Sequence, residues 1–304
     1  MRQPLAALVL LGLVALAPSA SAQSRVDERR PASPNGLVEI EIAVGSIRVI
    51  GWNRDEVQVT GTLGARASGL DFVSRPSRTR IQVEVEGNPR RVSSDLEVRV
   101  PAGSRVQVES FSGAIEVRDV SGRVKAESVS GSITITGKAS EVDAESVSGA
   151  VSITGPATRV RAGSTNASVT IRGSSGVIQA ETTNGALEVS GGDFQEARLE
   201  SVNGVIRFDG GLRTGASLDV ETVNGSIELR LPANVGADFT ISTYGGAIDS
   251  DFEVRLAPRR SKPGQRGRDR HRDEHEKELQ FSTGGGGANV AVTTLNGRIA
   301  LRKR

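Results

Sequence analysis

The sequence predicts an all-β fold: a single-stranded parallel β-helix, or β-solenoid, with rungs of about 18 residues. Three observations predict it. A motif recurs at nearly constant spacing, apolar residues alternate with polar ones inside each motif, and the composition favours small side chains. Only 3% of the 304 residues are aromatic, whereas 36 are glycine. Such a composition suits thin strands that stack on one another and are joined by tight turns.

The recurring motif is a β-prone run, a Ser/Thr-x-Ser/Asn-Gly turn and a second β-prone run, as in ESVSGSITI. Its turn position falls at Gly113, Gly131, Gly149, Ala167, Gly185, Gly204 and Gly225. The steps between successive positions are 18, 18, 18, 18, 19 and 21. This regularity is typical of a repeat architecture, in which each unit buries its apolar face only by stacking on its neighbours.

Apolar residues occupy four columns of the repeat, where a column is the set of residues at one position of the motif. In the repeat around Gly131, the four columns are occupied by Val124, Ala126, Ile133 and Ile135. The alternation predicts two strands per repeat, each with one face toward the core. A meander of hairpins would use similar turns, but stacked parallel rungs better explain why like residues recur at one period. The strand-crossover rule favours a right-handed coil.

The turn residues carry two expectations. Asn184-Gly185 and the later Asn-Gly pairs suit positive φ, and Asn166 is expected to adopt the left-handed conformation beside Ala167. Serines three positions before the glycine are expected to stabilise the turns through their hydroxyl groups. They are Ser128, Ser146, Ser164 and Ser201.

The chain is expected to divide into six segments. These are a signal peptide at 1–22, an N-terminal linker at 23–35, degenerate N-terminal rungs or a cap at 36–104, regular repeats at 105–256, a charged disordered insertion at 257–278 and a C-terminal rung at 279–304. Arg2, the apolar stretch after it and the small residues before Ala22 are typical of a cleaved secretory signal. The insertion has almost no apolar residues, which favours disorder. Terminal rungs are expected to look atypical because they close the core.

Composition limits the class of protein. The chain has 38 basic and 36 acidic residues, and the net charge of +2 indicates no nucleic-acid partner. It has no cysteine, which excludes disulfides, thiol catalysis and a lipid-carrying cysteine. With no later segment apolar enough to cross a membrane, the mature chain is expected to be exported to the periplasm, the cell surface or the extracellular space.

Several segments resemble a known family. They are GSIRVIGWNRDEVQV at 45–59, the SVSG and TVNG turns, and the ending TTLNGRIALRKR. They are similar to the bacterial β-strand-repeat envelope proteins known as "putative adhesins", a domain of unknown function. The resemblance implies a β-helix-like, non-enzymatic protein of the cell envelope or extracellular space. It supplies no catalytic residues to carry over.

One column of glutamates stands out, four positions before the turn glycine. It consists of Glu109, Glu127, Glu145, Glu181, Glu200 and Glu221. Glu41 falls at the same place before Gly45, and Gly163 interrupts the column. Alternation predicts that these side chains point outward, where neighbouring charges repel by about 1 kcal/mol in water. Two interpretations stay open: a solvated face, or a linear acidic strip that binds cations, a cationic peptide or a basic partner.

Neither a catalytic nor a metal site is predicted. His271 and His275 match the H-x-x-E-H pattern of one zinc-peptidase class, but they lie in a charged run without an apolar face or a clear third ligand. The abundant serines lack an oriented base. Trp52 is expected to pack at the N-terminal cap. We therefore expect no catalytic, cofactor-binding or metal-binding residues, and no cofactor.

The sequence thus predicts a non-enzymatic structural or interaction protein of the cell envelope or extracellular space, adhesin-like in character. Its partner would be an unknown envelope or surface molecule, either a protein or a polysaccharide. Two alternatives remain: a polysaccharide-active β-helix enzyme, and an envelope stress-sensing component that binds cationic ligands.

Overall fold

The computed structural model describes residues 24–65, 67–85, 87, 92–253 and 277–304. These residues form 22 β-strands and no helix, and hydrogen bonds join all the strands into one mixed sheet. The strands are β1 (Ser24–Pro31), β2 (Leu37–Trp52), β3 (Glu56–Leu63), β4 (Ala67–Arg75), β5 (Arg78–Val85), β6 (Ser93–Pro101), β7 (Arg105–Arg118), β8 (Arg123–Ser128), β9 (Ile133–Thr136), β10 (Glu141–Ser146), β11 (Val151–Thr154), β12 (Arg159–Ser164), β13 (Val169–Arg172), β14 (Gly176–Thr182), β15 (Leu187–Ser201), β16 (Ile206–Thr222), β17 (Ile227–Leu231), β18 (Ala237–Thr243), β19 (Ile248–Ser250), β20 (Lys277–Thr283), β21 (Ala288–Thr294) and β22 (Ile299–Lys303).

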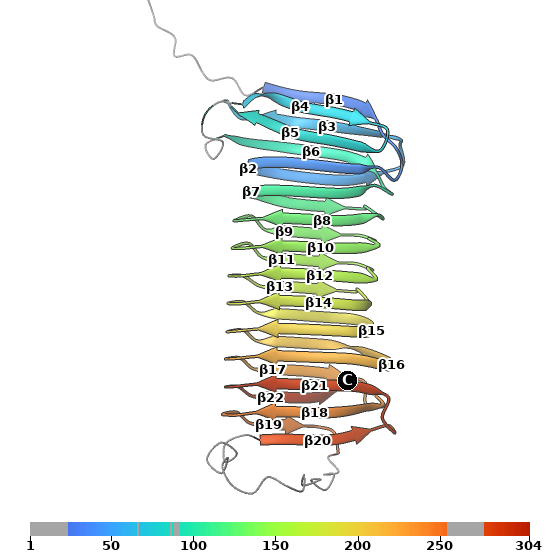
Figure 1. The fold of residues 1–304 in the computed structure, drawn as a ribbon, viewed down its shortest axis with the longest axis vertical. Coiled ribbons are helices and arrows are strands. Elements are labelled where there is room, and N and C mark those ends of the chain that lie inside the picture. Colours follow the sequence, from blue (N-terminus) through green and yellow to red (C-terminus); the bar gives the residue numbers. More distant parts are fainter. Residues whose placement is uncertain (1–23, 66, 86, 88–91, 254–276) are drawn as a thin grey trace, which may run out of the picture.

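The sheet is built as a tall stack in which each repeat adds one layer (Figure 1). Strands that precede the turn, such as β8, β10 and β12, pair with one another in parallel, and we call them the pre-turn ribbon. Strands that follow the turn, such as β9, β11 and β13, pair likewise and form the post-turn ribbon. Within the repeats at 105–231 the pairing between layers is parallel, so the hairpin meander is excluded there.

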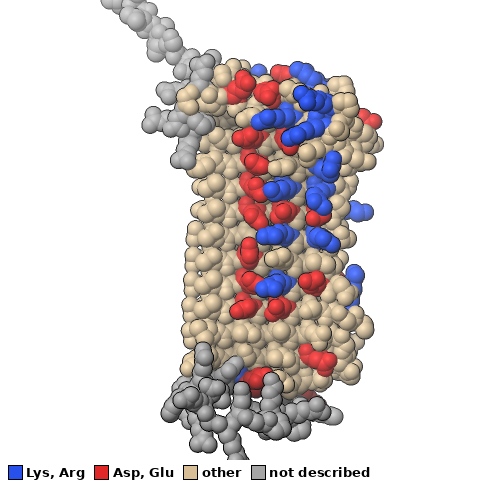
Figure 2. Space-filling view, viewed as in Figure 1, with Lys and Arg blue, Asp and Glu red and all other residues tan. Residues whose placement is uncertain are grey.

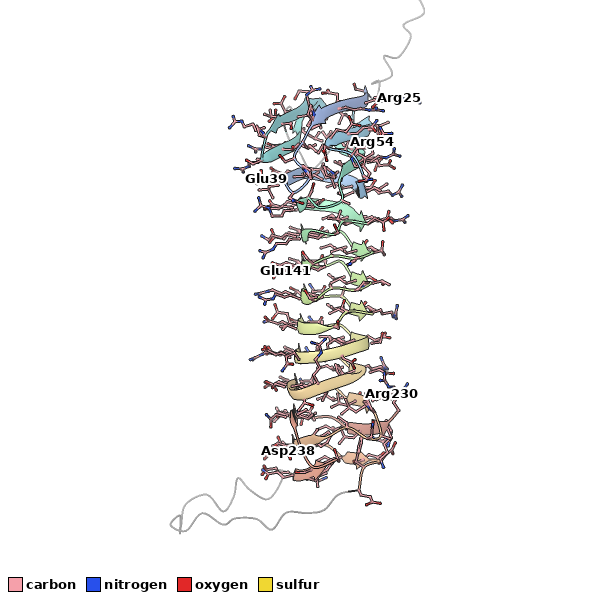
Figure 3. The ribbon with its side chains drawn as sticks, turned by 90° about the vertical axis from the view of Figure 1, so that its right-hand side faces the viewer. Arg25, Glu39, Arg54, Glu141, Arg230 and Asp238 are labelled. Carbon is pink, nitrogen blue, oxygen red and sulfur yellow. The ribbon has the colours of Figure 1, made fainter. Side chains whose placement is uncertain are left out.

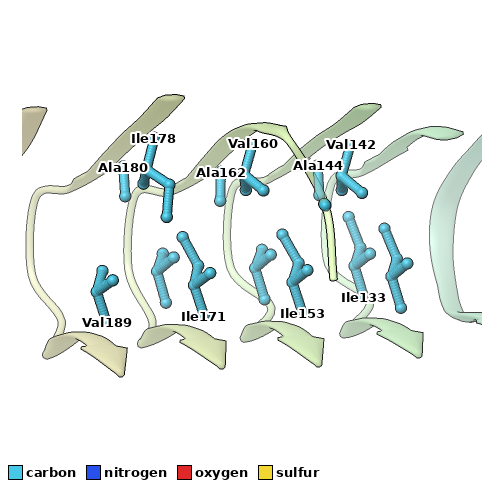
Figure 4. Packing of buried hydrophobic residues seen from close by; sticks show 14 of the residues in the cluster. Ile133, Val142, Ala144, Ile153, Val160, Ala162, Ile171, Ile178, Ala180 and Val189 are labelled. Carbon is cyan, nitrogen blue, oxygen red and sulfur yellow. The ribbon is translucent and has the colours of Figure 1, made fainter. Parts of the chain in front are cut away.

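The register places like residues over like residues, as the period predicts. Val124 pairs with Val142, and Val142 pairs with Val160, so each partner lies one repeat further along the chain. Figure 4 shows the two facing rows that result, with Val142 and Val160 on one ribbon and Ile133 and Ile153 on the other. All of these side chains are buried. Burial of such a side chain stabilises a fold by about 1.5–3 kcal/mol, so the continuous core is the main source of stability.

The two longer steps of the repeat do not disturb the Ser/Thr-x-x-Gly turns. The pairing of β14 with β15 shifts register after Gly176, and that of β15 with β16 shifts on either side of Asp193. Beyond these shifts Ser201 pairs with Thr222 in register. The extra residues therefore enter between one post-turn strand and the next pre-turn strand, away from the repeated turn.

At both ends the order of stacking differs from the order of the chain. β2 stacks directly on β7, with Ile40 opposite Val108, although β3 to β6 separate the two strands in the sequence. At the other end β22 pairs with β17 through Leu229 and Leu301, and β19 then stacks on β22. In Figure 1 the red strands β21 and β22 accordingly lie between β17 and the orange strands β18 and β19. The first and last rungs are thus held inside the stack.

The outermost layers are antiparallel. β4 pairs antiparallel with β5, β3 with β6 and β1 with β3 at one end, and β20 pairs antiparallel with β18 at the other. Such strands cover the edges that a parallel stack would leave open to another chain. Residues 24–31, expected within a linker, form β1 because their backbone completes the edge of β3. The expected signal peptide at 1–22 and most of the expected insertion lie outside the described residues.

The part of the chain that the structure describes contains no helix long and apolar enough to span a membrane. Trp52 lies at the end of β2, where its indole Nε1 donates a hydrogen bond to the backbone oxygen of Glu56 at 2.9 Å. The guanidinium groups of Arg54 and Arg99 lie 5.0 and 6.0 Å from its ring. Trp52 therefore packs within the N-terminal cap, as expected.

Candidate functional site

The predicted glutamate column runs as a file along the outer face of the pre-turn ribbon, with one gap at Gly163 between Glu145 and Glu181. Glu109 pairs with Glu127, Glu127 with Glu145, and Glu200 with Glu221. Glu41 stacks on Glu109 and extends the file by one layer. Figure 2 shows the file as a red line down the stack, with blue side chains beside it. We call it the acidic strip: Glu41, Glu109, Glu127, Glu145, Glu181, Glu200 and Glu221.

The acidic strip forms one wall of a groove with a volume of about 1240 Å³. The opposite wall is a second outward column, two positions before the turn glycine. We call this column the apolar ridge: Phe111, Val129, Val147, Thr165, Thr183, Val202 and Val223. Val129, Val147 and Val202 are 39%, 45% and 40% exposed. Seven strand spacings of about 4.8 Å separate Glu41 from Glu221, so the groove runs about 34 Å along the stack.

The charged side chains in the described lining of the groove are all acidic. Its described lining includes eight glutamates and no lysine or arginine. Figure 3 shows that other charged side chains project away from the stack, with Glu141 on the pre-turn ribbon and Arg230 on the post-turn ribbon. Beyond Glu221 the strip ends, because the next layer carries Thr293 at the same position. The groove therefore presents an acidic wall beside a wall that is apolar except at Thr165 and Thr183.

Part of the acidic strip is neutralised by bases in the adjacent outward column. Lys125 Nζ lies 2.6 Å from Glu127 Oε1, and Arg161 Nε lies 3.2 Å from Glu145 Oε1. Arg198 is hydrogen-bonded to Glu200. These side chains are exposed, so each pair contributes well under about 1 kcal/mol to stability. The pairs nonetheless remove much of the like-charge repulsion that the sequence implied.

Two glutamates of the strip differ from the rest. Neither Glu181 nor Glu221 has a lysine or arginine of the described chain within ion-pair distance. Glu109 also has no ion pair there, but it accepts a hydrogen bond from Gln107 Nε2 at 2.7 Å. Beside Glu181 the neighbouring outward position is held by Gln179, not by a base. The carboxylates of Glu181 and Glu221 are exposed and remain available to an external cation.

Asp143 lies beside the strip, between Lys125 and Arg161 in the stack. Burial raises the pKa of Asp143 and the charge of Glu145 raises it further, whereas Arg161 and Lys125 lower it. The raised pKa means that the ionised carboxylate is less favourable in the folded than in the unfolded chain. The stability contributed by protonated Asp143 is present below its unfolded pKa and is lost as the pH rises through its folded pKa.

The buried hydroxyls beneath the groove mostly stabilise the turns, as predicted. Ser128 Oγ accepts a hydrogen bond from the backbone N–H of Gly131 at 2.8 Å, and Ser146 Oγ accepts one from Gly149 at 2.9 Å. Ser146 Oγ also donates to the backbone oxygen of Gly131 at 3.0 Å, which ties one layer to the previous one. Ser201 departs from the prediction, because its buried hydroxyl has no hydrogen-bond partner within the described chain.

The turn glycines serve a different purpose from the one predicted. From Gly113 to Gly225 none of them has positive φ, and neither does Asn166, so the expected left-handed conformation is wrong. The glycines are required because the stacked turns approach closely. A Cβ on Gly131 would lie 1.8 Å from the backbone oxygen of Gly113, and one on Gly149 would lie 1.9 Å from that of Gly131.

Positive φ occurs instead in the other turn of the repeat, between a post-turn strand and the next pre-turn strand. Gly137, Gly155, Gly173 and Gly191 have φ of 103°, 126°, 75° and 77°. These glycines recur at the period of the repeat, a signal that the sequence also contains. Glycine is favoured there because other L-residues rarely adopt such φ values.

The asparagines of the turns form a ladder of side-chain amides. Each Nδ2 donates to the Oδ1 of the asparagine in the neighbouring layer, at 2.9 Å from Asn203 to Asn184 and 3.1 Å from Asn224 to Asn203. Asn166 and Asn296 occupy the two ends of the ladder. Stacked amides of this kind stabilise cross-β arrangements. This role was not predicted, although the repeated Asn in one column of the sequence is the signal that indicates it.

Comparison with solved structures finds matches at very low sequence identity. A "putative adhesin" from Parabacteroides distasonis has a TM-score of 0.53 and 7% identity, covering 92% of this chain and 98% of that chain. A "putative adhesin" from Bacteroides fragilis has a TM-score of 0.39 and 10% identity, covering 92% and 98%. A "putative cell adhesion protein" from Clostridium sporogenes has a TM-score of 0.25 and 9% identity, covering 92% and 100%. Of these three, only the first supports a shared fold.

No protein-family model matches the chain, and no curated protein matches it. The described residues contain no group of three or more His, Asp or Glu side chains placed to hold a metal ion. His271 and His275, whose spacing resembles a zinc motif, lie outside the described residues. The groove and its two walls are therefore the candidate site that the described structure offers.

Proposed function

We propose that this chain is a β-solenoid with rungs of about 18 residues and that it acts as an exported, non-enzymatic interaction protein of the adhesin type. The groove between the acidic strip and the apolar ridge is its contact face. That groove is the observation that carries the proposal: it repeats one pair of side-chain columns over about 34 Å. A long, regular face suits an extended partner that makes many weak contacts.

The fold supports this proposal at the level of architecture. The stacking of Val124, Val142 and Val160 in register is what a solenoid requires. The structure from Parabacteroides distasonis has a similar fold and is described as a "putative adhesin". The signal-peptide pattern at 1–22 favours export, which supports a role for the groove in the periplasm, at the cell surface or outside the cell.

The chemistry of the groove favours binding over catalysis. A hydrolase or lyase needs unlike groups, such as an acid and a base, that converge on one reacting bond. Here the layers present much the same set: a carboxylate, a buried hydroxyl and a small apolar or threonine side chain. A polysaccharide-active enzyme remains the alternative, and incubation with a panel of uronate polysaccharides tests it. We expect no release of reducing or unsaturated ends.

Site-specific photo-cross-linking in intact cells tests the contact face. A photoreactive amino acid replaces Val147, which is 45% exposed on the apolar ridge. The matched control replaces Thr154, which is exposed on the outer face of the post-turn ribbon. We expect a discrete adduct from position 147 and none from position 154. An adduct from position 154 alone, or the same adducts from both, would show that the groove is not the contact face.

A further inference from the structure

We propose that the groove holds an extended cationic peptide in the polyproline II conformation, with basic side chains on Glu181 and Glu221. This inference rests on the proposed function, because it names the partner of the same groove. Three features of the described residues favour this one occupant. They are the charge of the lining, the spacing of the unpaired carboxylates, and the apolar ridge opposite them.

The charge of the lining selects a cation. Eight glutamates and no basic residue line the described groove. Within the strip Glu127, Glu145 and Glu200 already have basic partners from their own chain. Glu109 also lacks an ion pair but accepts a hydrogen bond from Gln107, whereas Glu181 and Glu221 have neither within the described chain. They are therefore the carboxylates with most to gain from an external ammonium or guanidinium group.

The spacing of these two carboxylates selects a conformation. Glu181 and Glu221 lie two layers apart, with Glu200 between them, which is about 9.6 Å along the stack. A polyproline II helix has three residues per turn and advances about 9.3 Å per turn. A peptide with a basic residue at every third position would therefore place one basic side chain beside every second layer. An extended β-strand repeats its side-chain direction at intervals of about 6.8 Å, which does not match the spacing of Glu181 and Glu221.

The apolar ridge supplies the second contact. Val202 belongs to the layer between the two unpaired carboxylates and is 40% exposed. Its neighbour Val223 lines the same wall. A polyproline II peptide presents a different side of its backbone at each of its three positions, so a proline or valine can face the ridge while lysines face the strip. Its preformed backbone also loses little entropy on binding.

Calorimetry at low ionic strength with synthetic peptides tests the proposal on the purified chain without residues 1–22. The probe is a twelve-residue repeat of Lys-Pro-Val, which has a lysine at every third position. A peptide of the same composition with its lysines in one block is the control for charge alone. We expect the regular peptide to bind about tenfold more tightly, a difference of about 1.4 kcal/mol.

Two double variants that change the charge equally distinguish specific binding at Glu181 and Glu221 from general electrostatic attraction by the acidic strip. We expect Glu181→Gln with Glu221→Gln to weaken binding of the regular peptide about tenfold. Glu127→Gln with Glu200→Gln changes carboxylates that already have basic partners, so we expect at most about a twofold loss. Each change is to an exposed side chain, and unaltered urea midpoints of the variants check that the fold is retained.

Three results would overturn the inference. The first is an equal loss of affinity for the regular peptide in the two double variants. The second is equal affinity for the regular and block peptides. The third is that the peptide does not bind, while calcium alone binds and the Glu181 and Glu221 double variant abolishes that binding. The cross-link at position 147 tests the proposed function independently of the peptide experiment. If it persists while the peptide fails, the groove still contacts another partner. If the cross-link also fails, the proposed function falls with the inference.

Discussion

Replacement of a turn glycine tests the close stacking of the repeats. In Gly149→Ala the new Cβ would lie 1.9 Å from the backbone oxygen of Gly131 and 2.3 Å from its carbonyl carbon. An ordinary contact begins at 3.4 Å, so the turn must move by roughly 1.5 Å (3.4 − 1.9). Both clashing atoms are backbone and cannot rotate away. Overpacking of this kind costs about 1–3 kcal/mol, and we expect Gly149→Ala to destabilise the chain by that amount.

Ala167 shows that the stack can accommodate one alanine at this position. There the hydrogen bond from the turn N–H to the serine hydroxyl is 3.2 Å long, against 2.9 Å at Gly149. The turn at Ala167 is thus still closed by its serine, through a longer hydrogen bond. The expected loss at Gly149 is therefore a measurable strain, and the variant should still fold.

Gly163→Ala is the matched control, because it makes the same chemical change in the same part of the stack. A Cβ at Gly163 would meet its nearest atom, Cγ of Glu181, at 3.4 Å, and Gly163 does not have positive φ. Alanine is favoured over glycine within a strand, so we expect a gain of about 0.5 kcal/mol. Urea denaturation with a constant m-value measures both variants. Equal midpoints, or a lower midpoint for Gly163→Ala, would refute the reasoning.

Three further predictions concern the asparagine ladder, the partly buried carboxyl of Asp143 and the C-terminal rung. Asn203→Ala removes two amide bonds from the interior of the ladder and should lower the free energy of unfolding by about 1–2 kcal/mol in urea denaturation; no loss would mean that the ladder is not stabilising. Asp143→Asn should raise the urea midpoint at pH 7. The gain should decrease as the pH falls below the folded pKa of Asp143 and vanish below its unfolded pKa, where the wild-type carboxyl is protonated in both states. A gain that grows in acid would contradict the sign. Leu301→Ala should cost about 2–5 kcal/mol despite its place near the C-terminus, since its side chain is fully buried, whereas exposed Lys303→Ala should shift the midpoint little; similar midpoints would show that β22 is not held inside the stack.

The acidic strip could be predicted in part from the sequence. The column position of Glu127 and Glu145 and their outward direction follow from the period and the alternation. The register confirms the position, and the exposure of the two side chains confirms the direction. The sequence did not reveal which glutamates have basic partners. Arg161 pairs with Glu145 in the layer before it, whereas Arg198 pairs with Glu200 in its own strand. That choice depends on side-chain rotamers and on distances between layers, which column position does not specify.

The repeated turn glycines were located correctly from the sequence, but the reason predicted for them, positive φ, was wrong. Gly185 after Asn184 has the sequence of a turn with positive φ, and local preference supports that interpretation. In the structure Gly185 is required because a Cβ would lie 2.1 Å from the backbone oxygen of Ala167 in the adjacent layer. A contact between layers leaves no mark in the local turn sequence. Only the stacked coordinates distinguish close approach from backbone conformation.

The sequence by itself determined the period, the two strands per repeat, the side chains that enter the core, and the file of outward glutamates. These follow because a parallel in-register stack places each residue over its equivalent, so one repeat predicts the neighbours of the next. Only the tertiary structure decided the order of stacking at the ends, where β2 lies on β7 and β22 lies between β17 and β19. Any rung with an apolar face can stack on any other. Which one does so depends on how the whole chain covers its open edges, and no single repeat carries that information.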